Sequence, residues 1–136
     1  MQNPNAEVEI AAKGGIEAIL ATMKEHLEDA EVQRLSCAAL TNLSANDGNK
    51  MKIAKKGGIV AILATMRKHL EVAEVQHHAC GVLWNMSVLS DIKMEIVATG
   101  GIVAILAAMK EHLEDSSVQQ RAYGALGNLL PLKNDV

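Results

Sequence analysis

Two adjacent histidines and a nearby cysteine are the residues best suited to metal or acid–base chemistry. They stand in the segment HHAC as His77, His78 and Cys80. His77 and Cys80 are three residues apart, so on a helix both side chains would face one side and could share a metal ion. A structural zinc site takes four ligands, and no second cluster lies nearby in the sequence. We therefore expect no metal site and a cysteine that packs as a small apolar residue.

A set of asparagines recurs along the chain at a constant spacing. Asn42, Asn85 and Asn128 are separated by 43 residues each. A carboxamide carries two donors and an acceptor, which suits the N–H and C=O groups of an extended peptide. Asparagine is also a poor helix former that suits a helix end, and it can bond one repeat to the next. Peptide recognition and structural bonding are therefore both open from the residues alone.

The spacing of 43 residues extends over nearly the whole chain. Segments 14–33 and 57–76 are identical at 16 of 20 positions, and segments 57–76 and 100–119 at 14 of 20. We therefore predict one domain, 1–136, made of three tandem repeats. The predicted repeats are 5–47, 48–90 and 91–133.

The spacing also separates the other candidate metal ligands. Cys37 lies one repeat before Cys80. Neighbouring layers of helices lie about 8–10 Å apart, whereas a Zn–S bond measures about 2.3 Å, so the two thiols cannot share an ion without distortion. A ladder of histidines recurs in the same way, and we expect it to cap helix ends. This ladder consists of His26, His69 and His112.

Each repeat is predicted to contain three helices. A short helix-compatible segment precedes a glycine pair, which permits a sharp turn. In the first repeat the apolar spacing then predicts a helix over 16–27, and Asp29 is a plausible N-cap for a third helix that ends near Ser44. Acidic residues recur before each third helix, where they suit the helix dipole. A unit of 43 residues cannot bury its own apolar face, so the repeats should stack as an α-solenoid.

The chain resembles the armadillo-repeat family in the segments GGIEAIL, EVQRLSCAALTNLS, EVQHHACGVLWNMS and SVQQRAYGALGNLL. HEAT repeats are the near neighbour, but they usually lack the glycine break after a short first helix. The resemblance implies an all-α, right-handed solenoid whose third helices line a concave groove. It implies a non-enzymatic scaffold that binds an extended segment of another protein. The asparagines Asn42, Asn85 and Asn128 would then bond the backbone of that segment.

Other groove residues are expected one and two turns before each asparagine, because these positions share its helix face. In importin-α a tryptophan lies one turn before the asparagine; small residues stand there in this chain, which argues against a basic nuclear-localisation segment as partner. The small residues either leave room for a peptide or let helices pack closely. Trp84 is either a binding hot spot or a packing residue. The arginines and histidines make the face neutral to mildly basic, which leaves a partner with acidic side chains open. The predicted groove residues besides the asparagines are Arg34, Ala38, His77, His78, Gly81, Trp84, Gln120, Arg121 and Gly124.

Composition excludes several other classes. The net charge is −3, and the chain has one Trp, one Tyr and no Phe, so we expect no nucleic-acid partner. The longest apolar stretches, 57–66 and 100–109, are half of the about 20 residues that a membrane span needs. No Ser/His/Asp signature, phosphate-binding loop or HExxH motif is present, so we expect neither an enzyme nor a cofactor. With no visible signal peptide, a cytoplasmic or nuclear location is expected.

The two ends of the array lack the polar faces that usually cap a solenoid. Val8 and Ile10 are apolar with no preceding helix to cover them, and the last helix runs into the segment 129–132, Leu-Leu-Pro-Leu. Two explanations are open. The chain is part of a longer array, or its ends pair head to tail with other copies.

Overall fold

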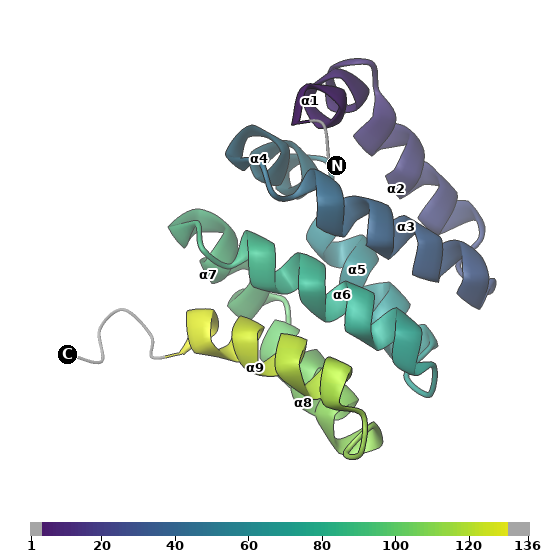
Figure 1. Ribbon diagram of the computed structural model, residues 1–136, viewed down its shortest axis with the longest axis vertical. Helices are drawn as coiled ribbons and strands as arrows, with labels where there is room; N and C mark the ends of the chain where they lie inside the picture. The colour runs from purple at the N-terminus through teal and green to yellow at the C-terminus, as the bar shows by residue number, and fades with distance from the viewer. Residues whose placement is uncertain (1–3, 131–136) are drawn as a thin grey trace.

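The computed structural model describes residues 4–130, and over this part it consists of nine α-helices joined by short turns (Figure 1). The predicted all-α fold is confirmed. Residues 131–133 of the predicted third repeat lie outside the described part. The helices are α1 Pro4–Ala12, α2 Gly15–Glu25, α3 Ala30–Leu43, α4 Asp47–Lys55, α5 Gly58–Lys68, α6 Ala73–Met86, α7 Ser90–Ala98, α8 Gly101–Glu111 and α9 Ser116–Leu129.

A left-handed glycine separates the first helix of each repeat from the second. Gly14, Gly57 and Gly100 have φ angles of 84°, 89° and 93°. A residue with a Cβ would be strained there. The next glycine is needed for a different reason, because a Cβ at Gly58 would overlap the side chain and carbonyl of Ile53. The glycine pair therefore fixes both the turn and the close packing of the two helices.

The third helix of each repeat begins where the sequence predicts. Asp29 accepts N–H bonds of 3.0 and 3.1 Å from the first turn of α3, and Asp115 accepts two of 3.1 Å from α9. The middle repeat has Val72 at this position and no side-chain cap. Side-chain caps of this kind stabilise a helix by about 1 kcal/mol. The predicted end near Ser44 also agrees, since Ser44 is the C-cap of α3.

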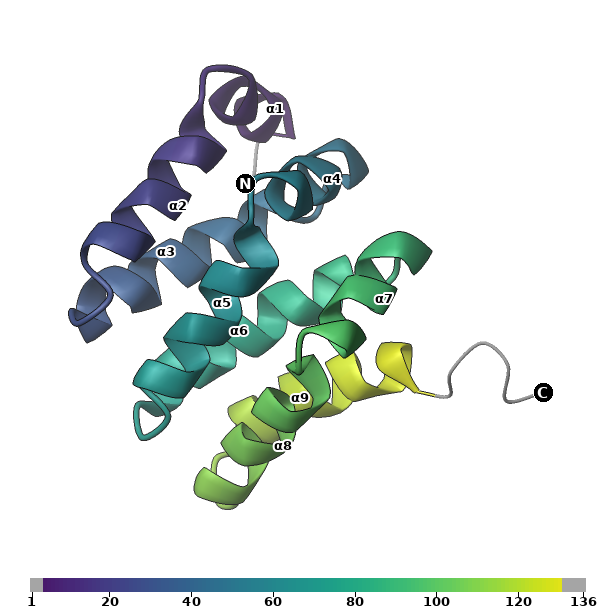
Figure 2. The same cartoon turned by 180° about the vertical axis from the view of Figure 1, so that it is seen from behind.

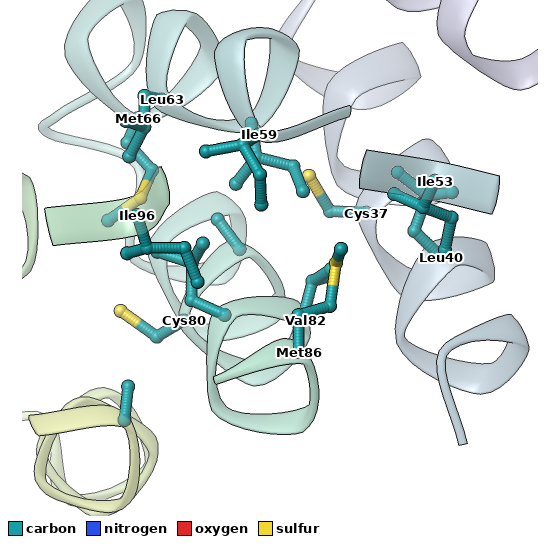
Figure 3. Close-up of a cluster of buried hydrophobic side chains, with 14 of the residues drawn as sticks. Cys37, Leu40, Ile53, Ile59, Leu63, Met66, Cys80, Val82, Met86 and Ile96 are labelled. Carbon is teal, nitrogen blue, oxygen red and sulfur yellow. The ribbon is translucent and has the colours of Figure 1, made fainter. Parts of the chain in front are cut away.

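The helices form a stack of repeats rather than a bundle around one centre. The third helices α3, α6 and α9 lie side by side, and α2, α5 and α8 run behind them (Figures 1 and 2). Helix α6 packs against both α3 and α9. The buried apolar side chains fill the space between these layers and continue from one repeat into the next (Figure 3). The middle repeat is thus covered on both sides.

No single helix among residues 4–130 is long and apolar enough to cross a membrane. Helices α7 and α8 reach the required length and composition only as a pair, and they meet at a bend of 70°.

Candidate functional site

The predicted groove residues all lie on the three third helices. We call the surface formed by α3, α6 and α9 the third-helix face. Because α6 packs between α3 and α9, residues at equivalent positions of the repeats follow one another across this face. The residues are Arg34, Ala38 and Asn42 on α3, His77, His78, Gly81, Trp84 and Asn85 on α6, and Gln120, Arg121, Gly124 and Asn128 on α9.

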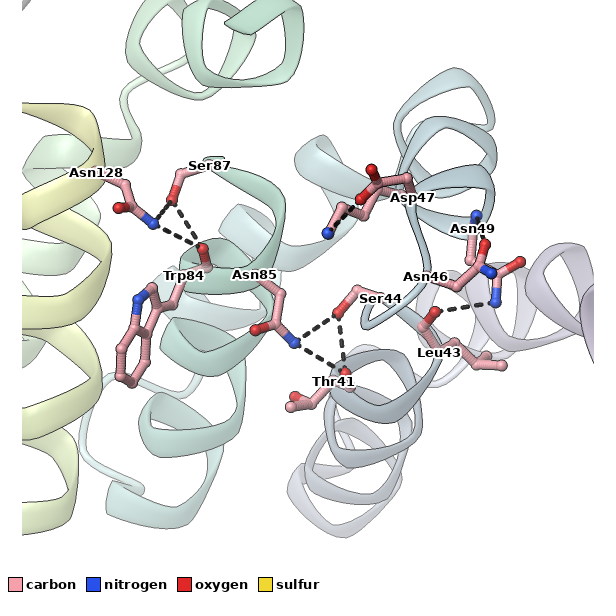
Figure 4. A network of polar contacts seen from close by, with 11 residues as sticks. Thr41, Leu43, Ser44, Asn46, Asp47, Asn49, Trp84, Asn85, Ser87 and Asn128 are labelled. Atoms are coloured by element: carbon pink, nitrogen blue, oxygen red, sulfur yellow. Dashed lines mark hydrogen bonds and ion pairs between the residues drawn. The ribbon is translucent and has the colours of Figure 1, made fainter. Parts of the chain in front are cut away.

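Two of the three asparagines bond one repeat to the next. Asn85 Nδ2 donates to Thr41 O at 3.0 Å and to Ser44 Oγ at 3.1 Å, at the end of α3 (Figure 4). Asn128 Nδ2 repeats this arrangement one layer on, at 3.1 Å from both acceptors, which are Trp84 O and Ser87 Oγ. These bonds go to helix-end carbonyls that have no intrahelical N–H donor, and each carbonyl also accepts the hydroxyl of Ser44 or Ser87. The amide nitrogens of Asn85 and Asn128 therefore have a structural role, because they bond one repeat to the next.

The asparagine ladder retains groups that are available to a ligand. Asn42 is exposed, and its side chain makes no hydrogen bond within the described part of the chain. The bonds of Asn85 and Asn128 use Nδ2, which leaves each Oδ1 without a donor among residues 4–130. An amide oxygen can accept the N–H of an extended peptide. Peptide recognition by the asparagine ladder stays a prediction. The groups that could take part in it are the Asn42 side chain and the Oδ1 atoms of Asn85 and Asn128.

Glycine on the third helices makes room for side chains of the neighbouring repeat. A Cβ at Gly81 would overlap the guanidinium of Arg121, and a Cβ at Gly124 would overlap the indole ring of Trp84. The two helices thus exchange side chains, with Arg121 lying on α6 and Trp84 lying on α9. Of the two explanations for small residues, close packing describes these two positions. It also gives Trp84 a packing role, although the side chain remains 37% exposed.

The arginines of the face differ in their partners. Arg34 Nε donates to Glu31 Oε1 at 3.0 Å, and its Nη1 lies 3.7 Å from Glu74 Oε2. Arg121 makes no hydrogen bond or ion pair within the described residues, and its Nη1 is buried. Arg34 is therefore neutralised by two carboxylates, and Arg121 is not.

The two adjacent histidines lie between these arginines. Their ring centroids are 4.8 Å apart in an edge-to-face arrangement. His77 Nδ1 donates to Ser117 O at 3.3 Å, since a carbonyl can only accept. Burial, followed by the charges of His77 and Arg121, lowers the pKa of His78 below its usual value, and His78 Nδ1 is buried without a partner. His78 is therefore neutral at pH 7.

The histidine ladder lies at helix ends, as predicted, and it also joins the repeats. His26, His69 and His112 are the C-cap residues of α2, α5 and α8. The ring Nε2 of His69 donates to Leu27 O at 2.6 Å, and that of His112 to Leu70 O at 2.7 Å. Each ring thus satisfies a carbonyl just beyond the second helix of the preceding repeat.

A buried glutamine ladder is the structural feature that the sequence interpretation missed. Gln33 Nε2 donates to Met23 O at 3.1 Å and to His26 O at 2.8 Å. Gln76 and Gln119 make the same pair of bonds within their own repeats, at 2.9 to 3.1 Å. These bonds tie each third helix to the end of its second helix. The signal was present, because glutamine recurs at the same spacing of 43 residues.

The cysteines are enclosed in the apolar core. Cys37 and Cys80 are both fully buried (Figure 3). Burial raises the pKa of each thiol to about 12, so both are protonated at pH 7. Within residues 4–130, no group of three or more His, Cys, Asp or Glu side chains is placed to hold a metal ion.

Comparison with protein families agrees with this geometry. The sequence model described as LRRK2 ARM repeat matches residues 5–135. The chain belongs to this armadillo-repeat family. We find no significant match among curated proteins or among solved structures. Proteins built from armadillo repeats are typically interaction scaffolds, which places this chain in the general class of protein-binding repeat domains.

Proposed function

We propose that this armadillo domain is a non-enzymatic scaffold that binds an extended segment of a partner protein along the third-helix face. The observation that carries the proposal is the row of carboxamides at one per repeat, exposed at Asn42 and half-buried at Asn85 and Asn128. Among residues 4–130 the oxygens of Asn85 and Asn128 and the whole side chain of Asn42 are unpaired. Layers of helices are about 8–10 Å apart, and an extended chain advances about 3.3–3.6 Å per residue. Three layers would therefore hold about six to eight residues.

Asn42 offers the cleanest test of this proposal. Its side chain makes no bond within the described residues, so Asn42→Ala should leave folding intact. The experiment selects eight-residue peptides from a random library on the wild-type protein and then measures their affinities by fluorescence anisotropy. We expect Asn42→Ala to weaken binding about tenfold, because a lost hydrogen bond in a covered site costs about 1–3 kcal/mol.

The control is Thr22→Ala on α2, which removes an exposed polar group outside the third-helix face and only a local bond to Ala18 O. This variant should bind like the wild type. Selected peptides that bind Asn42→Ala as tightly as wild type would remove the ladder from the account. A library that yields no binders would reject the peptide-binding function itself.

A second candidate function, end-to-end association of copies, is favoured by the two outer faces of the stack. Leu63 in the middle repeat is 1% exposed, whereas the equivalent Leu106 in the third repeat is 39% exposed. At the other end, the ring of the exposed His26 has no partner in the described residues, whereas the rings of its equivalents His69 and His112 each donate to a preceding repeat. The outer face of the first repeat thus carries the histidine donor that is used at the internal junctions. The outer face of the third repeat carries the apolar surface that is covered at those junctions.

Matched lysine substitutions test this second candidate. Leu106→Lys alters a position that is covered at the internal junction, whereas Val103→Lys alters one that is open in both repeats, since Val60 is also exposed. Sedimentation velocity at increasing concentration should show association in the wild type and in Val103→Lys, and its loss in Leu106→Lys. A wild-type protein that stays monomeric at millimolar concentration would exclude the candidate.

A further inference from the structure

Arg121 is the arginine of the third-helix face whose charge has no counterion among residues 4–130. Its guanidinium lies against Gly81 of the preceding repeat, and its buried Nη1 has no hydrogen-bond partner. Buried guanidinium nitrogens are ordinarily bonded, because an unpaired buried donor is costly. The other two arginines of the chain each have a hydrogen-bond partner. Arg34 bonds Glu31, and Arg67 donates to Thr99 O at 3.3 Å.

Gly81 leaves the space that the Arg121 guanidinium occupies. A glycine inside a helix is less favourable than alanine, so its presence in α6 calls for a reason. The reason is steric, because any Cβ at position 81 would meet Arg121 Nη1 and Cδ. Three residues along each helix, Trp84 lies on Gly124 in the same manner. The indole ring and the guanidinium are thus both fixed at the surface between α6 and α9.

No carboxylate of the described chain reaches Arg121. Glu74, the acidic residue that acts on His78, forms its ion pair with Arg34 at 3.7 Å. Asp115 at the start of α9 is engaged by the backbone of its own helix. The neighbouring histidine supplies no negative charge either. Arg121 is therefore a half-buried, planar, fork-shaped cation whose Nη1 is packed against Gly81 and which has no carboxylate partner among the described residues.

We propose that Arg121 binds the side-chain carboxylate of an aspartate or glutamate in the peptide that occupies the third-helix face. This proposal rests on the proposed function and names the side-chain chemistry that it selects. A guanidinium offers two parallel N–H donors to a carboxylate, and such charge-assisted pairs are stronger and more directional than neutral hydrogen bonds. The ligand would bond the Nε and Nη2 donors, which are unpaired among residues 4–130 and, unlike Nη1, are not buried.

The position of the acidic residue within the peptide also follows. Residues equivalent to Arg121 in the other repeats are His78 and Leu35, and Leu35 is 54% exposed. The face therefore changes from apolar at the first repeat to cationic at the third. Two layers span about 16–20 Å, which corresponds to about five or six residues of extended chain. In the peptide, the acidic residue should therefore lie about five or six residues from an apolar residue that covers Leu35.

The test is a double-mutant cycle on peptides selected from an eight-residue random library. We expect the wild type to enrich Asp or Glu at one position, and replacement of that Glu by Gln to weaken binding about tenfold or more, as for hydrogen bonds to charged groups. On the variant Arg121→Gln the same replacement should have no effect. Arg67→Gln, which removes an equal charge from α5, is the control and should retain the acidic preference.

Gly81→Ala provides a second variant that keeps the charge and moves it. The new methyl group displaces the guanidinium while alanine suits the helix, so folding should be retained and the acidic preference lost. Thermal melting of each variant checks that it is folded. An acidic preference that persists in Arg121→Gln, or bound peptides that show none in the wild type, would overturn this inference alone. A wild-type protein that binds no peptide at all would instead reject the proposed function.

Discussion

At the junction between the first two repeats, Thr65 donates a hydrogen bond of 2.7 Å to the buried Oε1 of Gln33. At the junction between the second and third repeats, Ala108 replaces that threonine, and the buried Oε1 of Gln76 has no partner in the described part of the chain. The asparagine and histidine bonds are the same at both junctions. The junctions also differ at the surface, where Arg121 and Trp84 cross between α6 and α9 at the second junction, whereas Thr41 at the first junction donates to His78 O at 3.2 Å. The repeat thus conserves the bonds at helix ends while the side chains between them change.

The largest effect should come from the repeat that belongs to both junctions. Leu83 in α6 is fully buried, whereas the equivalent Leu126 in α9 is only partly buried. We expect Leu83→Ala to lower the free energy of unfolding by about 2–5 kcal/mol, the range for a buried leucine. Leu126→Ala should cost clearly less. Chemical denaturation followed by circular dichroism measures both, and equal losses would contradict the unequal burial.

The next effect compares two glycines of α9, one packed against the neighbouring repeat and one with open space around it. Gly124→Ala would overlap the ring of Trp84, whereas Gly127 in the same helix has open space around it. Overpacking costs about 1–3 kcal/mol, and removal of a helical glycine returns about 0.5–1 kcal/mol. We therefore expect a net loss of about 1–2 kcal/mol for Gly124→Ala and a small gain for Gly127→Ala.

Fluorescence supplies a second measurement for the same pair of variants. Trp84 is the single tryptophan of the chain, so its emission reports on this contact alone. Gly124→Ala should shift the emission to longer wavelength as the ring moves into water, and Gly127→Ala should leave it unchanged. An unchanged spectrum in both variants would show that the ring does not depend on Gly124.

The missing bond at the second junction can be restored by copying the first. Ala108→Thr places a hydroxyl where Thr65 stands one repeat earlier, within reach of Gln76 Oε1. We expect a gain of about 0.5–1.5 kcal/mol, the net value of a buried hydrogen bond. Ala108→Val has the same shape without the donor and is the control. A gain in both variants would assign the effect to packing rather than to the hydrogen bond.

The sequence predicted the helices better than it predicted the roles of the face. The period of 43 residues, the glycine pairs and Asp29 were sufficient for the three-helix repeat, because each depends on local geometry. The role of Asn85 was left open, because the choice between a peptide and a helix-end carbonyl depends on how far apart neighbouring repeats lie. The exchange of Arg121 and Trp84 across two glycines was not predicted for the same reason. Spacing within one helix does not say which side chain of the next helix fills the gap.

The smallest expected effect tests the electrostatics that distinguish the junctions. The charged groups that act on His78 are Arg121 on α9, Arg34 on α3, and Glu74 and His77 on its own helix α6. Leu35 occupies the equivalent position in the first repeat. Burial and the neighbouring cations lower the pKa of His78, so the unfolded chain binds a proton more readily than the folded one. The contribution of His78 to the free energy of unfolding should therefore be fully present above about pH 6.5. It should be lost progressively as the pH falls below that value.

NMR titration of the His78 ring measures this effect directly. Arg121→Gln removes one of the cations that disfavour protonation, so the pKa of His78 should rise toward its usual value. Glu74→Gln removes the carboxylate that favours protonation, so the pKa should fall further. Burial is the larger cause and remains in both variants, which means that neither substitution should restore an unperturbed histidine. Opposite shifts in the two variants would establish that charges on α9 and on its own helix α6 both act on His78, and an unchanged pKa in both variants would contradict these electrostatic effects.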